Sequence, residues 1–287
     1  MTKKRERLYL IDGNSYVYRA FHAIRHLANS KGFPTNAVYG FTAMLMKIVR
    51  EEKPDYLAVA FDSKGPTTRH TYYPQYKATR PPMPEGLVPQ VPIIWDLVRA
   101  FRIPVLQQQG IEADDLLAAA TREGLGHHLD VVLVSGDKDL LQLVSPHVSV
   151  LDTMKEQRWT PEQVEKRYGI PPGELVEMMA LMGDATDNVP GVRGVGEKTA
   201  LELVKQFGTL EELYARLGEV KGEARKKVLE AGRDGAFLSR RLVTLDPDVA
   251  VTIDLEALRP REPDAAAALA IFREMEFAKF VRELTPP

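Results

Sequence analysis

The chain has 287 residues, of which 44% are hydrophobic and 27% charged, no cysteine, and a formal net charge of −2. This length accommodates one large or two ordinary domains, and the composition is that of a soluble globular protein. The apolar runs are too short to cross a bilayer, and no signal-peptide hydrophobic region follows the basic N-terminus, so we expect a cytoplasmic protein without a membrane partner. Without cysteine there are no disulfides or thiolate metal sites, and any metal ion must be held by oxygen.

The first half of the chain alternates short apolar strands with helical patterns. The predicted strands are 7–11, 55–61 and 130–135. Between them, apolar residues recur at helical spacing in 40–52, 91–101 and 112–124. Because the strands are almost continuously apolar, the pattern predicts an α/β fold with a parallel sheet that is covered by helices on both faces.

The pattern changes after about residue 160. Thr160 and Gln163 form a capping-box signature, and from the turn sequence "GIPPG" (169–173) onward most of the chain has helical patterns separated by glycines. We therefore expect an α/β core over 1–170 and a small helical subdomain over 171–287. Within that subdomain, 246–264 is predicted as a strand-like excursion and loop, and 264–284 as one last helix.

Acidic residues follow all three predicted strands. Asp12 and Asp62 come directly after the first two strands, and Asp137 lies two residues beyond the third. One such aspartate is commonly a helix cap or a turn former. Because parallel strands end at the same edge of a sheet, three of them predict a shared site at the carboxyl edge.

Two more acidic groups accompany the strand ends. Glu112, Asp114 and Asp115 open a predicted helix, where acids also interact favourably with the helix N-terminus, and Asp137 is followed by Asp139 in what could be a solvated turn. Gathered together, these carboxylates would repel one another unless cations neutralised them. An all-oxygen site suits Mg²⁺ or Mn²⁺, and two such ions form the usual apparatus for attack on a phosphodiester.

The net charge argues only weakly against a nucleic-acid partner. Nine acidic residues recur in motif-like settings: Asp12, Asp62, Glu112, Asp114, Asp115, Asp137, Asp139, Asp184 and Asp187. Setting these nine aside leaves 38 basic residues against 31 acidic ones. A modestly basic body around an acidic pit is compatible with binding of a polyanion.

The segment 69–86 mixes cations with tyrosines. Its cations Arg69, Lys77 and Arg80 could contact phosphates, and its tyrosines could stack on unpaired bases. The tyrosines are Tyr72, Tyr73 and Tyr76. The alternative is an exposed loop whose tyrosines fold onto the core. Arg19, on the helix after Asp12, is a further cation expected to face the acidic edge, unless it is an ordinary solvated arginine.

The stretch "GVRGVGEKTA" (191–200) superficially resembles a nucleotide-binding loop. Gly191 and Gly196 have the P-loop separation, but Glu197 intervenes before Lys198 and Thr199, and a helical pattern rather than a strand precedes them. We therefore disfavour a P-loop. The glycines, Gly194 among them, instead predict a tight hairpin, with a helix that begins near Glu197. Such a turn is either a structural connector or a backbone-amide site for a phosphate of nucleic acid.

Five motifs together resemble the 5′-nuclease family, and more narrowly the N-terminal 5′→3′ exonuclease domain of bacterial DNA polymerase I. They are "DGNSYVYRAFHA", "FDSKGPTTRHTYYPQYKATR", "EADDLLA", "SGDKDLLQLV" and "LMGDATDNVPGVRGVGEKTA". The resemblance runs in order over essentially the whole chain. It implies a resolvase-like or PIN-like core and a Mg²⁺-dependent nuclease of replication and repair. Such a nuclease cuts 5′ flaps, nicks and RNA-primer ends and leaves 5′-phosphates.

The resemblance also assigns residues. It implies one metal site at Asp12, Asp62, Glu112 and Asp114, with Asp115 close by, and a second at Asp137, Asp139, Asp184 and Asp187. Arg19, Arg69, Lys77 and Arg80 would grip the phosphate or the threaded strand, and residues about 66–90 would form an arch that admits a free 5′ end. The glycine hairpin would belong to a helix-hairpin-helix element (about 183–206) that holds duplex DNA and often binds K⁺.

The resemblance leaves alternatives open. The chain lacks a polymerase region, so it is either a stand-alone exonuclease, expected to be a monomer, or a domain linked to a polymerase. A module that binds DNA junctions without cutting them is the main functional alternative, and a P-loop phosphotransferase is a third.

Overall fold

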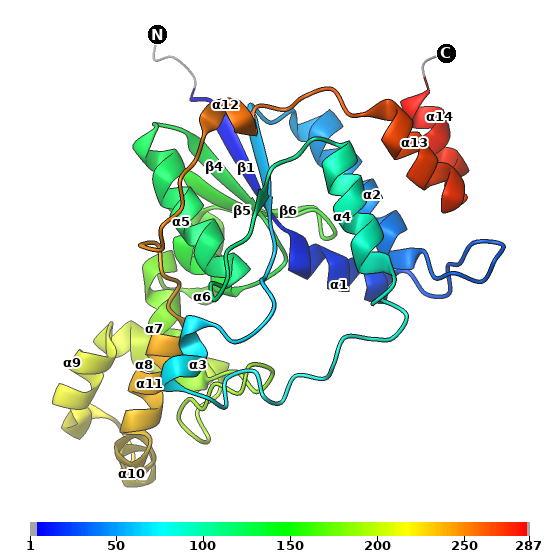
Figure 1. The fold of residues 1–287 in the computed structure, drawn as a ribbon. Coiled ribbons are helices and arrows are strands. Elements are labelled where there is room, and N and C mark those ends of the chain that lie inside the picture. The colour runs from blue at the N-terminus through cyan, green and yellow to red at the C-terminus, as the bar shows by residue number, and fades with distance from the viewer. Residues whose placement is uncertain (1–4, 286–287) are drawn as a thin grey trace.

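The computed structural model describes residues 5–285, and a six-stranded sheet forms its centre (Figure 1). The strand order is β3-β2-β1-β4-β5-β6. The strands are β1 (Arg7–Asp12), β2 (Tyr56–Ala60), β3 (Val105–Leu106), β4 (Asp130–Val134), β5 (Val148–Asp152) and β6 (Gln157–Trp159). The three predicted strands are confirmed. The sheet is parallel except for β6, which pairs antiparallel with β5 at one edge and was not predicted.

Helices cover both faces of the sheet, as the apolar strands predicted. Because side chains alternate along a strand, Leu8 and Leu10 of β1 pack with α5 (Ala113–Gly126), whereas Tyr9 and Ile11 pack on the opposite face. The helices of that opposite face are α1 (Gly13–Ala23), α2 (Asn36–Lys47) and α4 (Gln90–Ala100). A π-helical turn, η1 (Ile48–Glu52), continues α2.

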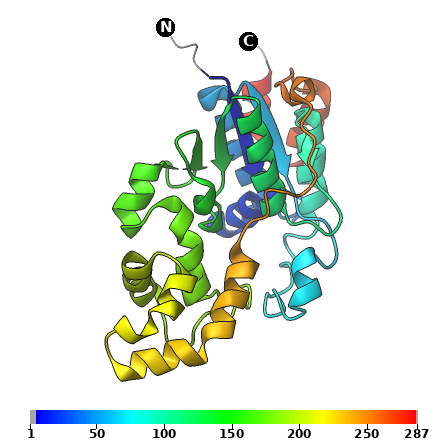
Figure 2. The ribbon, with the colours of Figure 1, turned by 90° about the vertical axis from the view of Figure 1, so that its left-hand side faces the viewer.

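A group of helices follows the sheet in the chain and lies beyond its carboxyl edge (Figure 2). It comprises α6 (Pro161–Tyr168), α7 (Leu175–Met182), α8 (Glu197–Phe207), α9 (Leu210–Ala215), α10 (Glu223–Ala231) and α11 (Arg233–Val243), with 3₁₀ turns η3 (Pro172–Glu174) and η4 (Leu217–Glu219). A further 3₁₀ turn, η2 (Asp139–Leu143), lies between β4 and β5. The capping box of Thr160 and Gln163 is confirmed, and α8 begins at Glu197 as expected. Within residues 5–285, no helix is both long and apolar enough to cross a membrane.

Two expectations for the C-terminal part are wrong. Segment 246–264 forms no strand and is extended loop around the single turn α12 (Leu255–Leu258). The predicted last helix is two helices, α13 (Ala265–Glu274) and α14 (Ala278–Leu284). Glu276 between them has a left-handed backbone (φ 61°), and buried Phe277 turns into the core, so the apolar pattern continues while the helix does not.

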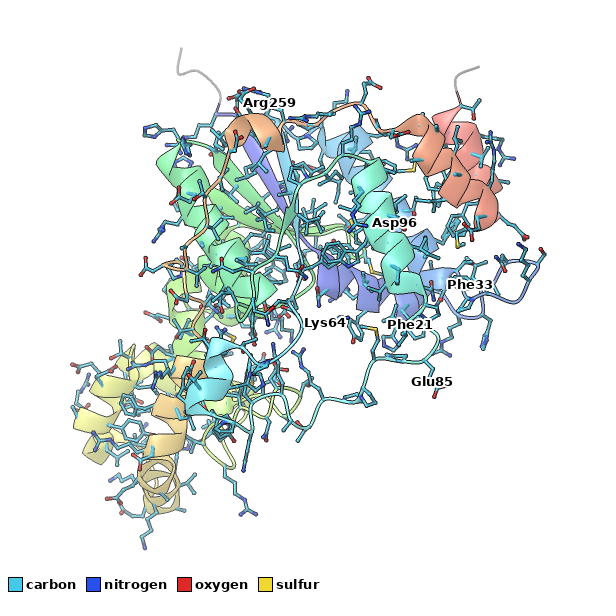
Figure 3. The ribbon with its side chains drawn as sticks, in the orientation of Figure 1. Phe21, Phe33, Lys64, Glu85, Asp96 and Arg259 are labelled. Atoms are coloured by element: carbon cyan, nitrogen blue, oxygen red, sulfur yellow. The ribbon has the colours of Figure 1, made fainter. Side chains whose placement is uncertain are left out.

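The segment 66–90 contains one short helix, α3 (Thr68–Tyr72), and otherwise turns until α4 begins. Figure 3 labels Lys64 just before it and Glu85 near its end, and between them the chain passes from below the sheet towards α1 and α4. Because few regular hydrogen bonds hold it, its position depends on the tertiary contacts described below.

Candidate active site

The carboxylates that follow the three predicted strands lie together at the carboxyl edge of the sheet. Asp12 ends β1, Asp62 follows β2 and Asp137 follows β4. These three side chains and Asp114, from the first turn of α5, line one cavity of about 250 Å³. The topology therefore brings together acids that are up to 125 positions apart in the sequence.

A larger cavity of about 560 Å³ adjoins the first. Its acidic lining consists of Glu112, Asp114, Asp137, Asp139, Asp184, Asp187 and Glu197. Asp114 and Asp137 line both cavities, so eight of the nine predicted carboxylates surround one continuous region. The ninth, Asp115, belongs to the lining of neither cavity.

Neighbouring polar groups orient the strand-end carboxylates. Asn14 donates to Asp62 Oδ2 at 2.9 Å and accepts from the Asp62 amide, while Ser135 Oγ donates to Asp12 Oδ2 at 2.7 Å. The Ser135 hydroxyl also accepts from the Asp137 amide at 2.9 Å. Asn14 and Ser135 were not among the predicted site residues, although they belong to "DGNSYVYRAFHA" and "SGDKDLLQLV" and lie two residues from Asp12 and Asp137 respectively.

Burial and mutual repulsion raise the pKa of several of these acids. Burial, together with Asp137 and Asp62, raises the pKa of Asp12 to about 7, and burial with Asp137 and Asp184 raises the pKa of Asp139 to about 8. The pKa of Asp114 is raised for the same reasons, burial first and then Asp12. Burial alone would raise the pKa of Glu112 as well, but Lys77 and Arg69 together lower it. The edge thus concentrates negative charge that its own cations compensate unevenly.

The donor set at this edge fits hard divalent cations. Every candidate ligand is a carboxylate, the type of oxygen donor that suits Mg²⁺ and Mn²⁺, and the raised pKa values show that a cation would relieve repulsion. Within the described part of the chain, no three acidic or histidine side chains converge tightly enough to hold an ion as they stand. Mg²⁺ retains several water ligands and is commonly bound by one or two carboxylates, so it does not need such a convergence.

All four predicted cations line the cavities of the acidic region and pair with carboxylates. Arg80 Nη2 lies 2.6 Å from Asp187, and Lys77 Nζ lies 3.1 Å from Glu112. Arg19 lines both cavities and pairs through Nη2 with buried Asp152 at 3.0 Å. Its Nη1 is buried and has no hydrogen-bond partner among residues 5–285. Asp152 ends β5, a strand that the sequence did not reveal, so this partner was missed.

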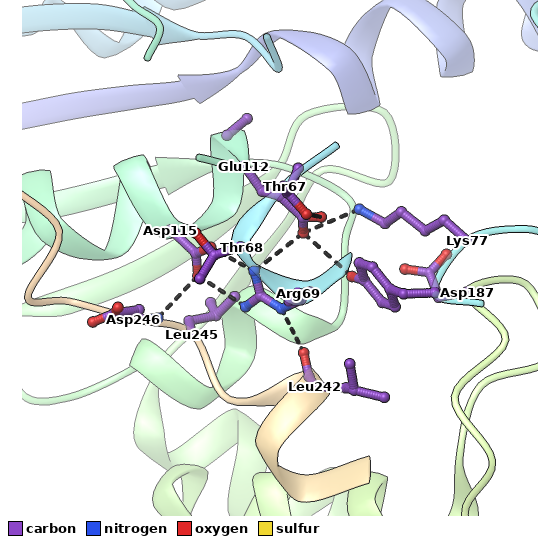
Figure 4. A network of polar contacts seen from close by, with 12 residues as sticks. Thr67, Thr68, Arg69, Lys77, Glu112, Asp115, Asp187, Leu242, Leu245 and Asp246 are labelled. Carbon is purple, nitrogen blue, oxygen red and sulfur yellow. Dashed lines mark hydrogen bonds and ion pairs between the residues drawn. The ribbon is translucent and has the colours of Figure 1, made fainter. Parts of the chain in front are cut away.

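The fourth predicted cation, Arg69, and two tyrosines are held differently from the expectation. Arg69 is buried and pairs with Asp115 and Glu112 (Figure 4). The Tyr72 ring lies under the Arg241 guanidinium, 3.8 Å from its carbon, and the hydroxyl of buried Tyr76 donates to Glu112 at 3.2 Å. As they stand, Arg241 covers one face of the Tyr72 ring, and Tyr76 is buried with the Lys77 ammonium 4.9 Å from its ring centre.

The glycine hairpin (residues 183–196) connects α7 to α8. Gly191 (φ 59°) and Gly194 (φ 88°) adopt left-handed backbones, and Gly196 precedes the first turn of α8 as its N-cap. A side chain at Gly191 would meet the backbone of Gly183 and Met182 at 2.5–2.6 Å, so the close approach requires glycine. Lys198 is exposed and Thr199 half-buried at the start of α8.

Two family models cover most of the chain. The N-terminal resolvase-like domain of 5′-3′ exonucleases matches residues 7–169, and the C-terminal SAM fold of 5′-3′ exonucleases matches residues 170–266. The fold class that the sequence predicted, an α/β core followed by a helical subdomain, is thereby confirmed.

Known proteins agree with these matches. A 5′-3′ exonuclease of Aquifex aeolicus is 39% identical over 96% of this chain and 94% of its own length. A DNA polymerase I of Bacillus caldotenax is 42% identical over 99% of this chain and 33% of its own length, so the chain spans about a third of such relatives. The solved T5 5′-exonuclease with bound zinc ions has the same fold, with 21% identity, a TM-score of 0.71 and coverage of 97% of this chain and 98% of that one. The chain belongs to the 5′-3′ exonuclease family.

Proposed function

We propose that this chain is a structure-specific 5′ nuclease that hydrolyses phosphodiester bonds at 5′ flaps, nicks and RNA-primer ends of duplex DNA. The observation that carries the proposal is the set of eight predicted carboxylates around two adjoining cavities at the carboxyl edge of the sheet. A cluster of this charge has little use in a protein that merely binds DNA, because it would repel the phosphate backbone unless cations intervened.

The carboxylates divide between two Mg²⁺ sites in this proposal, and Mn²⁺ substitutes for Mg²⁺. Asp12, Asp62, Glu112 and Asp114 would hold one ion, and Asp137, Asp139, Asp184 and Asp187 the other. When bound, such a pair of ions supplies an activated water and stabilises the leaving oxygen, which yields products with 5′-phosphates. Asn14 and Ser135 orient the carboxylates, and their hydrogen bonds to Asp62 and Asp12 support this role.

Cations beside the carboxylates would receive the substrate strand. Arg19 has a buried, unpartnered Nη1 within the described chain and lines both cavities, which suits a phosphate oxygen. Lys77 and Arg80 belong to the segment 66–90, the proposed arch. Their present partners, Glu112 and Asp187, would bind metal ions in the active state, which would release both cations towards DNA. Tyr76, whose hydroxyl donates to Glu112, would be freed towards a base by the same change, whereas Tyr72 keeps its contacts with Arg241 of α11.

The glycine hairpin would hold the duplex beyond the cut. Gly194 and Gly196 are exposed just before α8 begins, and exposed Lys198 with Thr199 suits phosphates without reading sequence. Gly191 is buried and its amide donates to Ser239, so its part in this proposal is to shape the turn. In this proposal the element is a helix-hairpin-helix that also accommodates K⁺. It lies in a helical subdomain that begins near residue 170 and follows the nuclease core.

The proposed setting is DNA replication and repair in the bacterial cytoplasm. The Bacillus caldotenax relative is a DNA polymerase I, whereas the Aquifex aeolicus relative is a 5′-3′ exonuclease of nearly this length. A covalently linked polymerase domain is thus one proposed arrangement, and a monomeric stand-alone enzyme is the other.

Cleavage of a defined DNA structure tests the proposal. A duplex with a labelled 5′ flap is incubated with the protein and Mg²⁺, and a parallel reaction contains EDTA. We expect short 5′-phosphorylated products with Mg²⁺ and none with EDTA, and a blunt duplex of the same sequence should be cut more slowly. Binding of the flap without any cleavage in Mg²⁺ or Mn²⁺ would favour the non-catalytic junction-binding module instead.

A further inference from the structure

Arg69 is buried and hydrogen-bonded within the protein to an extent that is unusual for a residue that binds a substrate phosphate. It lies on α3 at the base of the proposed arch, and its side chain is 6% exposed. All three guanidinium nitrogens donate to protein oxygens: Nε to the Leu242 carbonyl at 2.7 Å, Nη2 to the Thr244 carbonyl at 3.0 Å, and Nη1 and Nη2 to Asp115. This use of the planar fork leaves Arg69 little capacity for a phosphate.

Asp115 is the counterpart of Arg69 rather than a member of the cavity lining. Its Oδ1 accepts from Arg69 Nη2 and from the Asp246 amide, both at 2.9 Å, and Oδ2 accepts from Arg69 Nη1. Adjacent Asp114 lines both cavities instead. Two neighbouring carboxylates of one helix thus face different surroundings, as the 100° step between helical residues allows.

The same contacts fix the end of α11. The last carbonyls of a helix lack intrahelical partners, and a cation is favourable there. Arg69 supplies donors to the Leu242 and Thr244 carbonyls, and the Tyr72 hydroxyl donates to the Arg241 carbonyl at 3.3 Å. Side chains from α3 therefore complete the C-terminus of a helix about 170 residues later in the chain.

α11 in turn contacts the glycine hairpin. The Ser239 hydroxyl, which is fully buried, accepts from the Gly191 amide at 2.8 Å. A Cβ atom at Gly235 would lie 2.8 Å from the Gly191 carbonyl, which shows how closely the helix and the hairpin approach. A displacement of α11 would therefore move the hairpin as well.

We infer that Arg69 and Asp115 form a positioning joint, here called the Arg69 clasp, which ties the base of the arch, α5 and α11 together. Through α11 the clasp sets where the hairpin lies relative to the carboxylates. Arg69 then acts as a positioning residue, not as a phosphate contact, and Asp115 is not a metal ligand. The functional meaning of this joint rests on the proposed nuclease activity, but its existence does not.

Hydrogen–deuterium exchange of the metal-free protein tests the clasp without any cleavage. Arg69→Lys keeps the positive charge but loses the planar set of guanidinium donors. Asp115→Asn keeps the size and shape of the side chain but loses its negative charge. Hydrogen bonds to charged groups are worth enough that each change should speed exchange at least about 10-fold, both in 66–80 and near 240–246. Arg122→Lys is the matched control, because Arg122 pairs with Asp248 at the exposed surface of α5, and it should leave both segments unchanged.

Further outcomes discriminate between the two assignments. The double variant Arg69→Lys/Asp115→Asn should exchange no faster than the more affected single variant, because both remove one joint. Binding of Mn²⁺, measured by calorimetry, should be nearly unchanged in Asp115→Asn and strongly weakened in Asp114→Asn. Exchange in Arg69→Lys that matches Arg122→Lys, or loss of Mn²⁺ binding in Asp115→Asn, would overturn the inference. Absence of cleavage by the unaltered protein would contradict the proposed function and leave the clasp intact.

Discussion

The acidic edge of the sheet and the glycine hairpin differ in whether side chains or the backbone supply their functional groups. At the edge, side chains carry the chemistry: eight predicted carboxylates from strand ends, helix starts and loops surround two cavities. In the hairpin, the backbone would carry it, because the left-handed φ values of Gly191 and Gly194 shape a turn that leaves Gly194 and Gly196 exposed before α8. In the proposed function the edge repels phosphate until cations arrive, whereas the hairpin attracts phosphate directly.

In the proposed function, this difference separates cleavage of the DNA, which the edge performs, from binding of the duplex, which the hairpin performs. Loss or binding of metal ions at the edge would change the cleavage rate without changing how the hairpin holds the duplex. A backbone site beside an exposed lysine can hold any duplex, because phosphates are the same in every sequence. Substitutions at the edge should therefore affect rate, and substitutions at the hairpin should affect binding.

The largest expected effect is at the edge. We expect Asp137→Ala to abolish cleavage, because Asp137 lines both cavities and its loss would empty a metal site. Loss of a group that merely orients a ligand costs about 10- to 100-fold, so loss of a ligand should cost more. Flap cleavage and DNA affinity are measured in parallel, and affinity should be nearly intact. Full activity in this variant would show that the second cluster is wrongly assigned.

At the hairpin, we expect Gly191→Ala to destabilise the protein and to weaken duplex binding. The new Cβ would collide with the backbone of Gly183 and Met182, and φ 59° is unfavourable for alanine. Such strain costs about 1–3 kcal/mol, which thermal or urea unfolding can resolve. Gly173→Ala, where a Cβ meets open space, is the control and should change little. Equal stability of the two variants would argue against the tight hairpin.

The edge should also respond to pH in the absence of metal. The pKa values of Asp12 and Asp139 are raised to about 7 and about 8, so the folded state holds protons that the unfolded state releases near pH 4. The stability that these groups contribute is complete below pH 4 and is lost as the pH rises towards 8. We expect the melting temperature of metal-free protein to fall over this range.

Mg²⁺ should reverse that loss, since it replaces the protons. Its stabilising effect, measured as the rise in melting temperature, should be larger at pH 8 than at pH 5. Asp139→Asn should flatten the metal-free profile, because it removes one raised pKa. A Mg²⁺ effect of equal size at both pH values would contradict the link between the raised pKa values and metal binding.

The smallest expected effect concerns Lys198 at the hairpin. We expect Lys198→Ala to weaken binding to all duplexes alike and to lower the salt slope of the binding constant by about 1, as loss of one phosphate contact predicts. Fluorescence titrations at several salt concentrations, with two unrelated duplex sequences, measure both quantities. A change in sequence preference would contradict a backbone contact.

Elements whose apolar periodicity is local could be predicted from the sequence. The strands before Asp12, Asp62 and Asp137 are continuous apolar runs, and because parallel strands end together, their acids could be placed at one edge. Strands β3 and β6, with two and three half-buried residues, carry no comparable pattern. With β5 missed as well, the Arg19 partner Asp152 could not be found.

The partners of the cations depend on contacts that no local pattern encodes. Arg69 and Asp115 are 46 residues apart, and Arg69 and Leu242 are 173 apart. A basic segment with tyrosines suggests a nucleic-acid surface, yet a buried arginine needs a carboxylate, and the fold supplies Asp115. The split between Asp114 and Asp115 likewise follows from what packs on each side of α5.

The most direct test of this account is single-turnover cleavage of a 5′-flap duplex in Mg²⁺, with the enzyme concentration raised to saturation. This measurement separates the rate of chemistry from the strength of binding. Asp137→Ala should stay inactive at saturation, whereas Lys198→Ala should recover the unaltered rate once enough enzyme is present. If the hairpin variant remained slow at saturation, or the edge variant recovered, the division between a cutting edge and a holding hairpin would be wrong.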